Sequence, residues 1–200
     1  MIYIVELKYG NTNTFFIRGR AGNLLVDTDY AGTLSPFYKA IKEKHIDICE
    51  IDYILATHYH PDHIGLVSEL MKQGVKLLLI DKQKGGVHFS DALLRRNRHL
   101  HYEPIREENA TVIRLDESRC FLKKMGIDGE IIATESHSAD GIALMMDDGH
   151  CIVGDLEPFE YLGAYDGNEK LKCDWERILR HDPKVIYYGH ANKKYRLTGK

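Results

Sequence analysis

Three histidines and one aspartate lie within six residues of each other, in the segment Thr57-His58-Tyr59-His60-Pro61-Asp62-His63. The apolar run 51–56 predicts a buried strand directly before this segment. Residues two apart in an extended chain point to the same side, so His58 and His60 offer two imidazoles to one ion. Pro61 favours extended conformations at His60, which suits this geometry. The chain must therefore fold so that a strand ends where a metal ion binds.

The second half of this segment predicts a further set of ligands. Asp62 and His63 fall in the first turn of a helix expected over 62–73, where they are able to face a second ion. Neutral imidazoles and carboxylates suit Zn²⁺, and also Fe or Mn. Asp62 alone is also a reasonable helix N-cap. Three clustered histidines have no comparable structural explanation, so we interpret the segment as a metal-binding motif.

The rest of the chain alternates strands with helices, which predicts an α/β fold. Strands are expected at 2–7, 14–17, 24–26, 51–56, 75–80, 111–115, 130–134, 142–146, 151–153 and 185–188. Helices are expected at 33–45, 62–73, 118–124 and 175–180. The 200 residues contain no Pro/Gly/Ser-rich linker, so we expect a single domain over 1–200.

The segment 82–108 differs from its surroundings because it is polar, contains Gly85-Gly86 and is rich in arginine and histidine. It is expected to hold a short helix near 92–98 and to form a loop with a function or a mobile loop. One interpretation is a cap or lid in which Arg95 and Arg98 recognise an anionic substrate. The alternative is a solvated helix face.

Three further candidate ligands lie far along the chain beside predicted strands. His137 lies in a loop between two such strands, whereas Asp155 and His190 each follow directly after one. Strand ends are where an α/β domain presents side chains to a site. A single histidine in such a place is weak evidence, but the order and context of the three together favour metal ligation.

This set of motifs resembles the metallo-β-lactamase superfamily, whose pattern is H-x-H-x-D-H followed by a loop His, an Asp and a final His. The resemblance covers nearly the whole chain and rests on His58–His63 and on four other segments: Leu24-Leu25-Val26-Asp27-Thr28, Ser136-His137-Ser138-Ala139-Asp140-Gly141, Val153-Gly154-Asp155-Leu156 and Tyr188-Gly189-His190. It implies an αββα sandwich with two divalent metal ions at one edge, zinc being expected and iron or manganese possible.

The resemblance also implies how the ligands divide. The first metal would be bound by His58, His60 and His137. The second would be bound by Asp62, His63 and His190. Asp155 would bridge both metals.

A two-metal site of this kind predicts a hydrolase. A hydroxide bridging the metals would attack an ester, thioester, lactone, amide or phosphodiester bond, and Asp62 would be the catalytic residue that orients this nucleophile or takes its proton. Tyr59 and Tyr188 flank ligands, so each is a candidate to hydrogen-bond the substrate, although packing is the role that we favour for both.

Two other functions remain open. Some members of the superfamily are thiol or persulfide dioxygenases with a single iron, and the sequence does not count bound metals. Diiron members generally carry Glu where this chain has His60, which argues against that version. A protein that kept the fold but binds without catalysis is the third interpretation, although such relatives usually lose ligands.

Composition limits the partners. The formal net charge is −3, so nucleic acid is not the expected partner and a small-molecule substrate is. No apolar stretch is long enough to cross a bilayer, and the N-terminal residues do not resemble a signal peptide. The four cysteines are widely spaced, as is typical of free thiols in a reducing compartment. We therefore expect a cytoplasmic protein of undetermined oligomeric state.

Overall fold

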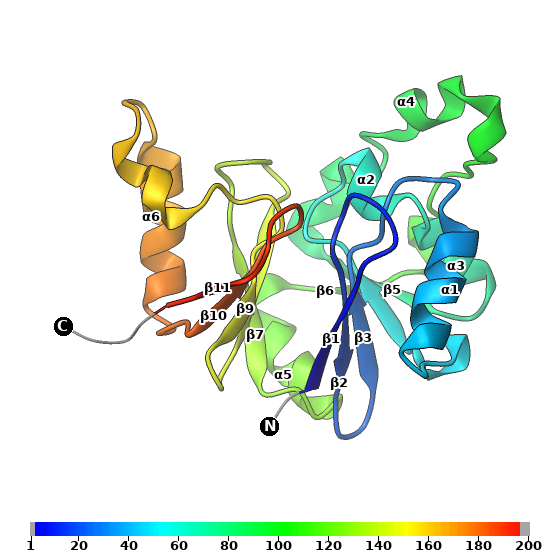
Figure 1. Ribbon diagram of the computed structural model, residues 1–200, viewed down its shortest axis with the longest axis horizontal. Coiled ribbons are helices and arrows are strands. Elements are labelled where there is room, and N and C mark those ends of the chain that lie inside the picture. The colour runs from blue at the N-terminus through cyan, green and yellow to red at the C-terminus, as the bar shows by residue number, and fades with distance from the viewer. Residues whose placement is uncertain (1–2, 197–200) are drawn as a thin grey trace.

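The structure is a computed structural model that describes residues 3–196. Its described part contains two β-sheets that face each other (Figure 1). The first sheet has the order β1 (Tyr3–Leu7), β2 (Thr14–Arg18), β3 (Asn23–Val26), β4 (Tyr53–Leu55), β5 (Lys76–Ile80) and β6 (Thr111–Ile113). The second has the order β11 (Lys194–Tyr195), β10 (Val185–Tyr187), β9 (His150–Ile152), β8 (Ile142–Met146) and β7 (Gly129–Ala133). Parallel pairing occurs from β3 to β6 and between β9 and β10, and the other pairs are antiparallel.

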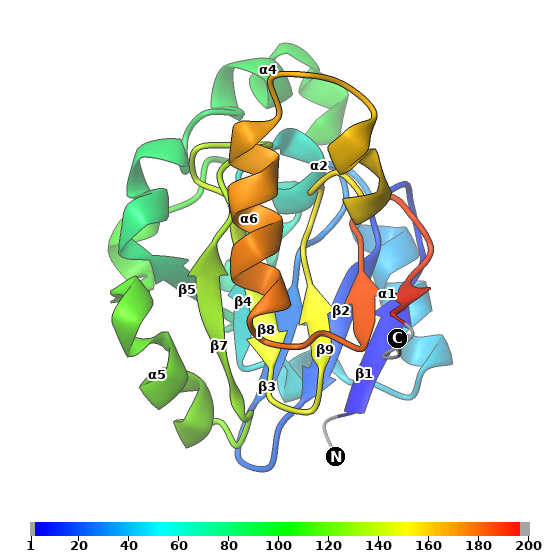
Figure 2. The ribbon, with the colours of Figure 1, turned by 90° about the vertical axis from the view of Figure 1, so that its left-hand side faces the viewer.

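Helices cover the outer faces of the two sheets. α1 (Leu34–Glu43) and α3 (Val67–Lys72) lie against the first sheet, and α6 (Glu169–Leu179) lies across the second (Figure 2). α5 (Ser118–Lys124) packs beside β7. Two shorter helices, α2 (Pro61–Ile64) and α4 (Asp91–Arg96), lie at the end of the molecule where β4 and β9 finish. The 3-10 helices are η1 (Ile48–Glu50), η2 (Asp81–Gly86), η3 (Arg98–Leu100), η4 (Glu107–Asn109), η5 (Leu115–Glu117) and η6 (Phe159–Gly163).

Three buried clusters fill the spaces between these layers. Successive side chains of a strand point to opposite faces, and in β2 this sends Phe16 to the helix side while Phe15 and Ile17 face the other sheet. In β8, Met145 packs towards Trp175 of α6. One cluster lies under α1 and α3, one between the sheets and one under α6. The predicted αββα sandwich is confirmed.

The predicted helix over 62–73 is wrong as a continuous element, because it is broken into α2 and α3. Gly65 lies at the break, where its backbone N–H donates to the carbonyl of Asp29 (3.1 Å). The N–H of Leu66 donates to the Thr28 hydroxyl (3.3 Å) instead of to the preceding turn. A Cβ at residue 65 would collide with the backbone of Tyr30 and Ala31. This close approach between loop and helix draws the end of β3 against the metal-binding motif.

The predicted helix over 175–180 is also wrong in extent, because α6 begins at Glu169. Its first half is dominated by charged and polar residues, so the apolar periodicity there is weak. The structure buries Leu171, Trp175 and Ile178 on one face, with Asp174 beside them. The carboxylate of Asp174 accepts a hydrogen bond from the backbone N–H of Ser136 (2.7 Å), which explains an acidic residue on the buried face.

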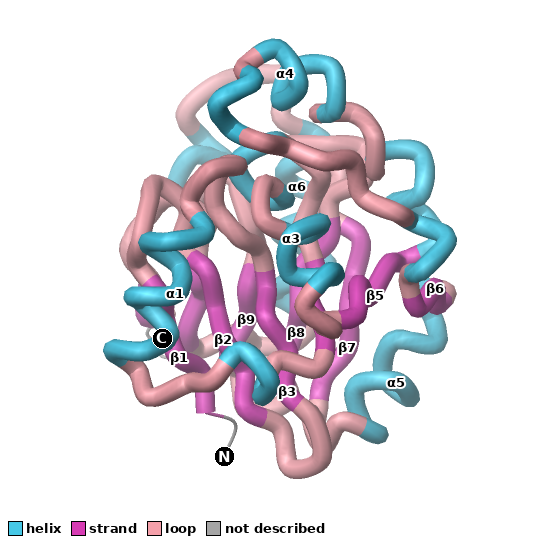
Figure 3. The backbone as a smooth tube through the Cα atoms, turned by 90° about the vertical axis from the view of Figure 1, so that its right-hand side faces the viewer, coloured by secondary structure: helices cyan, strands magenta, loops and turns pink. Residues whose placement is uncertain are grey.

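The segment 82–108 contains α4 and η3 and overlaps η2 and η4, and Figure 3 shows α4 standing above the ends of the sheets. Two of its apolar residues, Val87 and Leu94, are completely buried against the main core. The four cysteines are free, as predicted, and Cys151 is the buried one. Within residues 3–196, no helix combines the length and the apolar content needed to cross a membrane.

Candidate metal centre

All seven predicted ligands lie together at one edge of the sandwich. His58 follows β4, Asp155 follows β9 and His190 follows β10, so three strand ends meet there. His137 comes from the loop between β7 and β8. The predicted extended geometry at His60 is present, with φ −71° and ψ 153°, and the chain turns into α2 directly after it.

His58, His60 and His137 form the first group. One ring nitrogen from each lies within 4.8 Å of the others. Nδ1 of His60 and Nε2 of His137 are 3.1 Å apart. At this distance either one ring donates a hydrogen bond to the other, or a cation takes the place of the shared proton. This arrangement suits a cation.

Asp62, His63 and His190 form the second group, with the same 4.8 Å limit between their ligand atoms. Oδ2 of Asp62 lies 3.1 Å from Nε2 of His190. The side chains of Asp62 and His190 are each about a third exposed, whereas His63 is fully buried. The second group is therefore open to solvent on one side.

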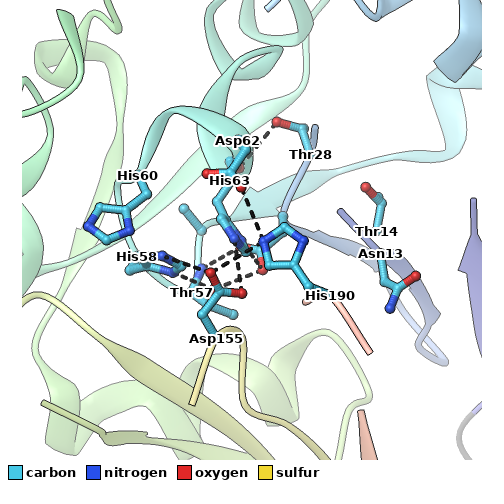
Figure 4. A network of polar contacts seen from close by, with 12 residues as sticks. Asn13, Thr14, Thr28, Thr57, His58, His60, Asp62, His63, Asp155 and His190 are labelled. Carbon is cyan, nitrogen blue, oxygen red and sulfur yellow. Dashed lines mark hydrogen bonds and ion pairs between the residues drawn. The ribbon is translucent and has the colours of Figure 1, made fainter. Parts of the chain in front are cut away.

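Asp155 stands between the two groups (Figure 4). Its Oδ1 lies 3.2 Å from Nε2 of His63, and its Oδ2 lies 3.3 Å from Nε2 of His190. The same Oδ2 is 3.7 Å from Nε2 of His137 and 3.8 Å from Nε2 of His58. One carboxylate thus faces both groups.

The residues fit a pair of divalent cations. Nε2 of His58 is buried and makes no hydrogen bond, an arrangement that is costly unless the atom is a ligand. Burial first, and then the neighbouring His63, lower the pKa of His58 to about 2, so its ring is neutral and able to coordinate. Burial likewise lowers the pKa of His137. The set of imidazole nitrogens and carboxylate oxygens suits Zn, Fe or Mn.

Asp27, at the end of β3, orients the ligands from behind. Its Oδ2 lies 3.0 Å from Nδ1 of His63, which leaves Nε2 of that ring facing the centre. The same carboxylate accepts hydrogen bonds from the backbone N–H of Thr57 (2.6 Å) and from its hydroxyl (2.8 Å). Asp27 is fully buried and adopts a left-handed φ of 60°. Such a conformation in a non-glycine residue is sustained by the surrounding contacts.

The charges around His63 set its protonation in the metal-free protein. Burial of the ring lowers its pKa, but the carboxylates of Asp27 and Asp155 outweigh burial and raise it to about 10. The pKa of Asp155 is lowered: burial opposes this shift, but the hydrogen bond and the charge of His63 prevail. A proton on His63 therefore stabilises the carboxylates when no cation does.

Residues from the loop between β1 and β2 hold His190. Its Nδ1 lies 3.0 Å from the carbonyl oxygen of Asn11, so that Nε2 faces the centre. The side-chain amide of Asn13 donates to the carbonyls of Tyr188 and Ala191, both at 2.9 Å. The backbone N–H of Asn13 donates to the carbonyl of Gly189 (2.7 Å). Asn13 thus binds the chain on both sides of His190, and no motif in the sequence pointed to it.

The backbone of Tyr59, between the first two ligands, is bonded on both sides. Its N–H donates to the carboxylate of Asp140 (2.7 Å), and its carbonyl accepts from the hydroxyl of Ser90 (2.7 Å). Asp140 belongs to the loop that carries His137, and Lys82 Nζ donates to the Ala139 carbonyl of that loop (2.9 Å). The loop that carries His137 is therefore hydrogen-bonded to the backbone between His58 and His60.

Two glycines allow the strand ends to approach closely. A Cβ at Gly189 would collide with Oδ1 of Asp155 and lie 2.9 Å from Cε1 of His63. Gly154 has a φ of +58°, and a Cβ there would lie 2.9 Å from Cβ of Thr57. Both glycines were visible in the sequence as parts of motifs, but only the structure shows what they make room for.

The four residues predicted to bind substrate do not lie among the ligands: two are buried tyrosines and two are arginines of the segment 82–108. Tyr59 is completely buried in the main core, and Tyr188 is buried under α6. Packing is therefore the role that the structure supports for both, because neither ring presents a surface to a ligand. Arg95 lies on α4, 3.9 Å from the carboxylate of Asp91 one turn earlier. Arg98 is an exposed residue of η3. A substrate role for the two arginines stays a prediction.

Two facing sheets with outer helices, and clustered His and Asp side chains at one edge, define the metallo-β-lactamase fold. Residues 7–190 match the family profile described as the metallo-beta-lactamase superfamily, and the chain belongs to that superfamily. A metallo-beta-lactamase family protein from Thermus thermophilus has a TM-score of 0.74 to this chain. The two share 19% identity over 97% of this chain and 74% of the other, a likeness that shows the fold.

The curated relatives are longer proteins, and their descriptions differ from one another. A beta-lactamase-like protein 2 homolog from Drosophila melanogaster is 25% identical over 187 residues, 90% of this chain and 59% of that protein. Flavo-diiron protein FprA2 from Clostridium acetobutylicum is 28% identical over 89 residues, 44% of this chain and 22% of that protein. This chain thus spans less than two thirds of the length of both relatives.

Proposed function

We propose that the protein is a hydrolase that uses two divalent cations, with zinc as the expected metal, to cleave an ester, thioester, lactone or phosphodiester bond of a small molecule. The single observation that carries this proposal is the position of Asp155. Its carboxylate lies 3.2 Å from His63 and 3.3 Å from His190 of one group, and 3.7 Å from His137 of the other. A carboxylate shared between two ligand groups is typical of a two-metal site.

Two cations held here by the two groups would lower the pKa of bound water and polarise the bond under attack. The chain supplies the remaining functions. Asp62 has a carboxylate on the solvent-open side of the centre, 33% exposed, and holds the proton removed from the attacking water. Asp27 keeps the ring of His63 oriented by its contact with Nδ1.

An oxidative reaction at a single iron is the second candidate. The partial match to a protein described as flavo-diiron supports iron as a metal for this kind of site, although it does not favour one iron over two. The presence of His60 rather than a carboxylate, with its Nδ1 facing His137 at 3.1 Å, favours the hydrolytic function, because three imidazoles suit zinc.

The test is a hydrolysis screen of lactones, thioesters and phosphodiesters on metal-loaded protein, with elemental analysis of the same sample. We expect two zinc ions per chain and turnover in at least one class. His58→Ala is expected to abolish that turnover. His45→Asn is the matched control, since His45 is an exposed histidine at the end of α1, and asparagine tolerates its left-handed φ of 55°.

Two results would contradict the proposal. One is turnover that survives in His58→Ala, which would assign the activity to a contaminant. The other is one iron per chain together with oxygen uptake in the presence of a thiol or persulfide, which would favour the dioxygenase.

A further inference from the structure

An exposed aromatic ring lies directly beside the first ligand group. Phe89 is 72% exposed, and its ring centroid is 5.7 Å from that of His60, with an interplanar angle of 35°. No other exposed large hydrophobic side chain within residues 3–196 has a recorded ring contact with a predicted ligand. A phenylalanine left open to water forgoes the stabilisation that burial of its ring would supply.

The exposure of Phe89 is imposed by the residues around it. Ser90 is buried and donates its hydroxyl to the carbonyl of Tyr59 (2.7 Å). Val87 and Leu94, on either side, are completely buried. The backbone N–H of Phe89 itself donates to the carbonyl of Gly86 (2.9 Å). Burial of Val87 and Leu94 and the hydrogen bond of Ser90 thus fix the chain before and after Phe89. The Phe89 ring is therefore held beside His60.

A second apolar side chain is exposed in the same segment. Leu93, four residues on and in α4, is 48% exposed. The charged side chain that follows it, Arg95, lies beside Asp91 at 3.9 Å, where its charge is partly balanced within the helix. The cap thus carries two exposed apolar side chains, Phe89 and Leu93, beside His88, which lies 3.1 Å from the carboxylate of Asp91.

We propose that Phe89, extended by Leu93, forms an apolar wall that binds an alkyl or aryl group of the substrate next to the reacting bond. This inference rests on the proposed function and narrows its substrate class to molecules that carry such a group. The argument for this occupant is continuity, since the Phe89 ring stands beside His60, and a substrate group on that side of a reacting atom held among His58, His60 and His137 would lie against it. Contact between that group and the Phe89 ring would lower the dissociation constant of the substrate, because both apolar surfaces leave water.

The test uses binding to cobalt-loaded protein, which does not depend on turnover. Two primary thiols serve as probes, 2-mercaptoethanol and 2-phenylethanethiol, and their dissociation constants are measured from the thiolate-to-cobalt absorption band. We expect the phenyl probe to bind about tenfold more tightly to the unaltered protein. In Phe89→Ala this ratio is expected to fall about fivefold, while the affinity for 2-mercaptoethanol and the cobalt content stay unchanged.

Further variants separate the apolar wall from a general loss of structure. Phe89→Leu is expected to keep an intermediate ratio, and Leu93→Ala to lose less than Phe89→Ala. Tyr3→Ala is the matched control, because Tyr3 is another exposed aromatic residue, 64% exposed, in β1. An equal affinity for both probes, or the same ratio in Phe89→Ala as in the unaltered protein, overturns the inference.

The outcomes for the two proposals are distinguishable. A preference for the phenyl probe that depends on Phe89, in a protein that hydrolyses no compound of the screen, contradicts the hydrolase and supports the apolar wall. Hydrolysis of a compound in the screen, together with a probe preference that does not depend on Phe89, supports the hydrolase and contradicts the apolar wall. Protein that takes up no cobalt contradicts both.

Discussion

The carboxylate of Asp27 and the imidazole of His63 are bonded in the fully buried interior, with Oδ2 of Asp27 3.0 Å from Nδ1 of His63. The contact fixes which ring nitrogen faces the metal centre. It also joins the end of β3 to the first turn of α2, two elements separated in the chain by α1, η1 and β4. The orientation of the ligands therefore depends on contacts from behind them, and substitutions at such contacts should change metal binding.

Asp27→Asn is expected to weaken binding of the second cation by about 10- to 100-fold, because the amide no longer provides the negative charge that orients His63 and makes it a stronger ligand. Binding at the first group is expected to change less, since it reaches Asp27 only through Thr57. Equilibrium dialysis against zinc measures both constants. Asp128→Asn is the control, as Asp128 pairs with Arg20 at an exposed position. Equal losses in both variants would contradict the positioning role.

The two ligand groups should respond differently to pH. In the metal-free protein the pKa of His63 is raised to about 10, so a cation must displace a proton from its ring. Affinity at the second group should therefore rise about tenfold per pH unit between pH 6 and 8. The pKa values of His58 and His137 are lowered, so these two ligands of the first group should contribute little dependence on pH.

Calorimetry in two buffers of different ionisation enthalpy counts the protons released on metal binding, and we expect one from His63. The stability of the metal-free fold changes with pH in the opposite direction to the metal affinity. Because the folded pKa of His63 lies above its unfolded value, its protonation stabilises the metal-free fold below about pH 6.5, and this contribution is lost as the pH rises towards 10. A metal-free protein that becomes more stable over this range because of His63 would contradict the assignment, and His63→Ala isolates that contribution.

Gly189→Ala should disrupt the centre without removing any ligand. The added Cβ would collide with Oδ1 of Asp155 and press on the ring of His63, so Asp155 has to move away from one ligand group. We expect metal content to fall to one ion per chain or less, measured by elemental analysis. Gly163→Ala is the control, because a Cβ there meets nothing within 4 Å. A Gly189→Ala protein with full metal content would show that the strand ends are farther apart than described.

Asn13→Ala should weaken the second cation site by releasing the chain around His190. The variant loses two donated hydrogen bonds, to the carbonyls of Tyr188 and Ala191, and we expect an affinity loss of about tenfold. Asn11→Ala is a stringent control, because Asn11 holds His190 through its backbone carbonyl, which the substitution retains. Titration with cobalt measures both variants. Equal effects would mean that the side chain of Asn13 has no specific role.

The candidate ligands could be picked out from the sequence partly by local rules and partly by the family resemblance, which implied the complete set. His58 and His60 share one side of an extended segment, Pro61 forces the turn into a helix, and Asp155 and His190 end apolar strand patterns. Local patterns also gave the α/β class of the fold, whereas the αββα order of the layers was implied by the family resemblance; the structure shows how neighbours such as Phe15 and Phe16 face different layers.

Local patterns failed where one part of the chain acts on a distant part. The break between α2 and α3 depends on Gly65 meeting the loop at Asp29, and no periodicity records such a contact. The buried face of α6 includes Asp174, whose carboxylate accepts the N–H of Ser136, and a search for apolar periodicity does not recognise such a residue as buried. Tyr59 and Tyr188, although close to ligands in sequence, are buried in the core. Alternation along an extended segment turns Tyr59 away from its neighbours His58 and His60, whereas the position of Tyr188, two residues before His190, depends on its packing under α6.

The sequence by itself therefore determined which side chains are able to bind metal and on which kinds of element they lie, because those properties depend on residue type and local conformation. Only the tertiary structure decided how the ligands are oriented and what surrounds them. The carbonyl of Asn11, the amide of Asn13 and the exposed ring of Phe89 reach the centre across long stretches of chain. Such contacts depend on how the two sheets pack, and packing is a property of the whole chain.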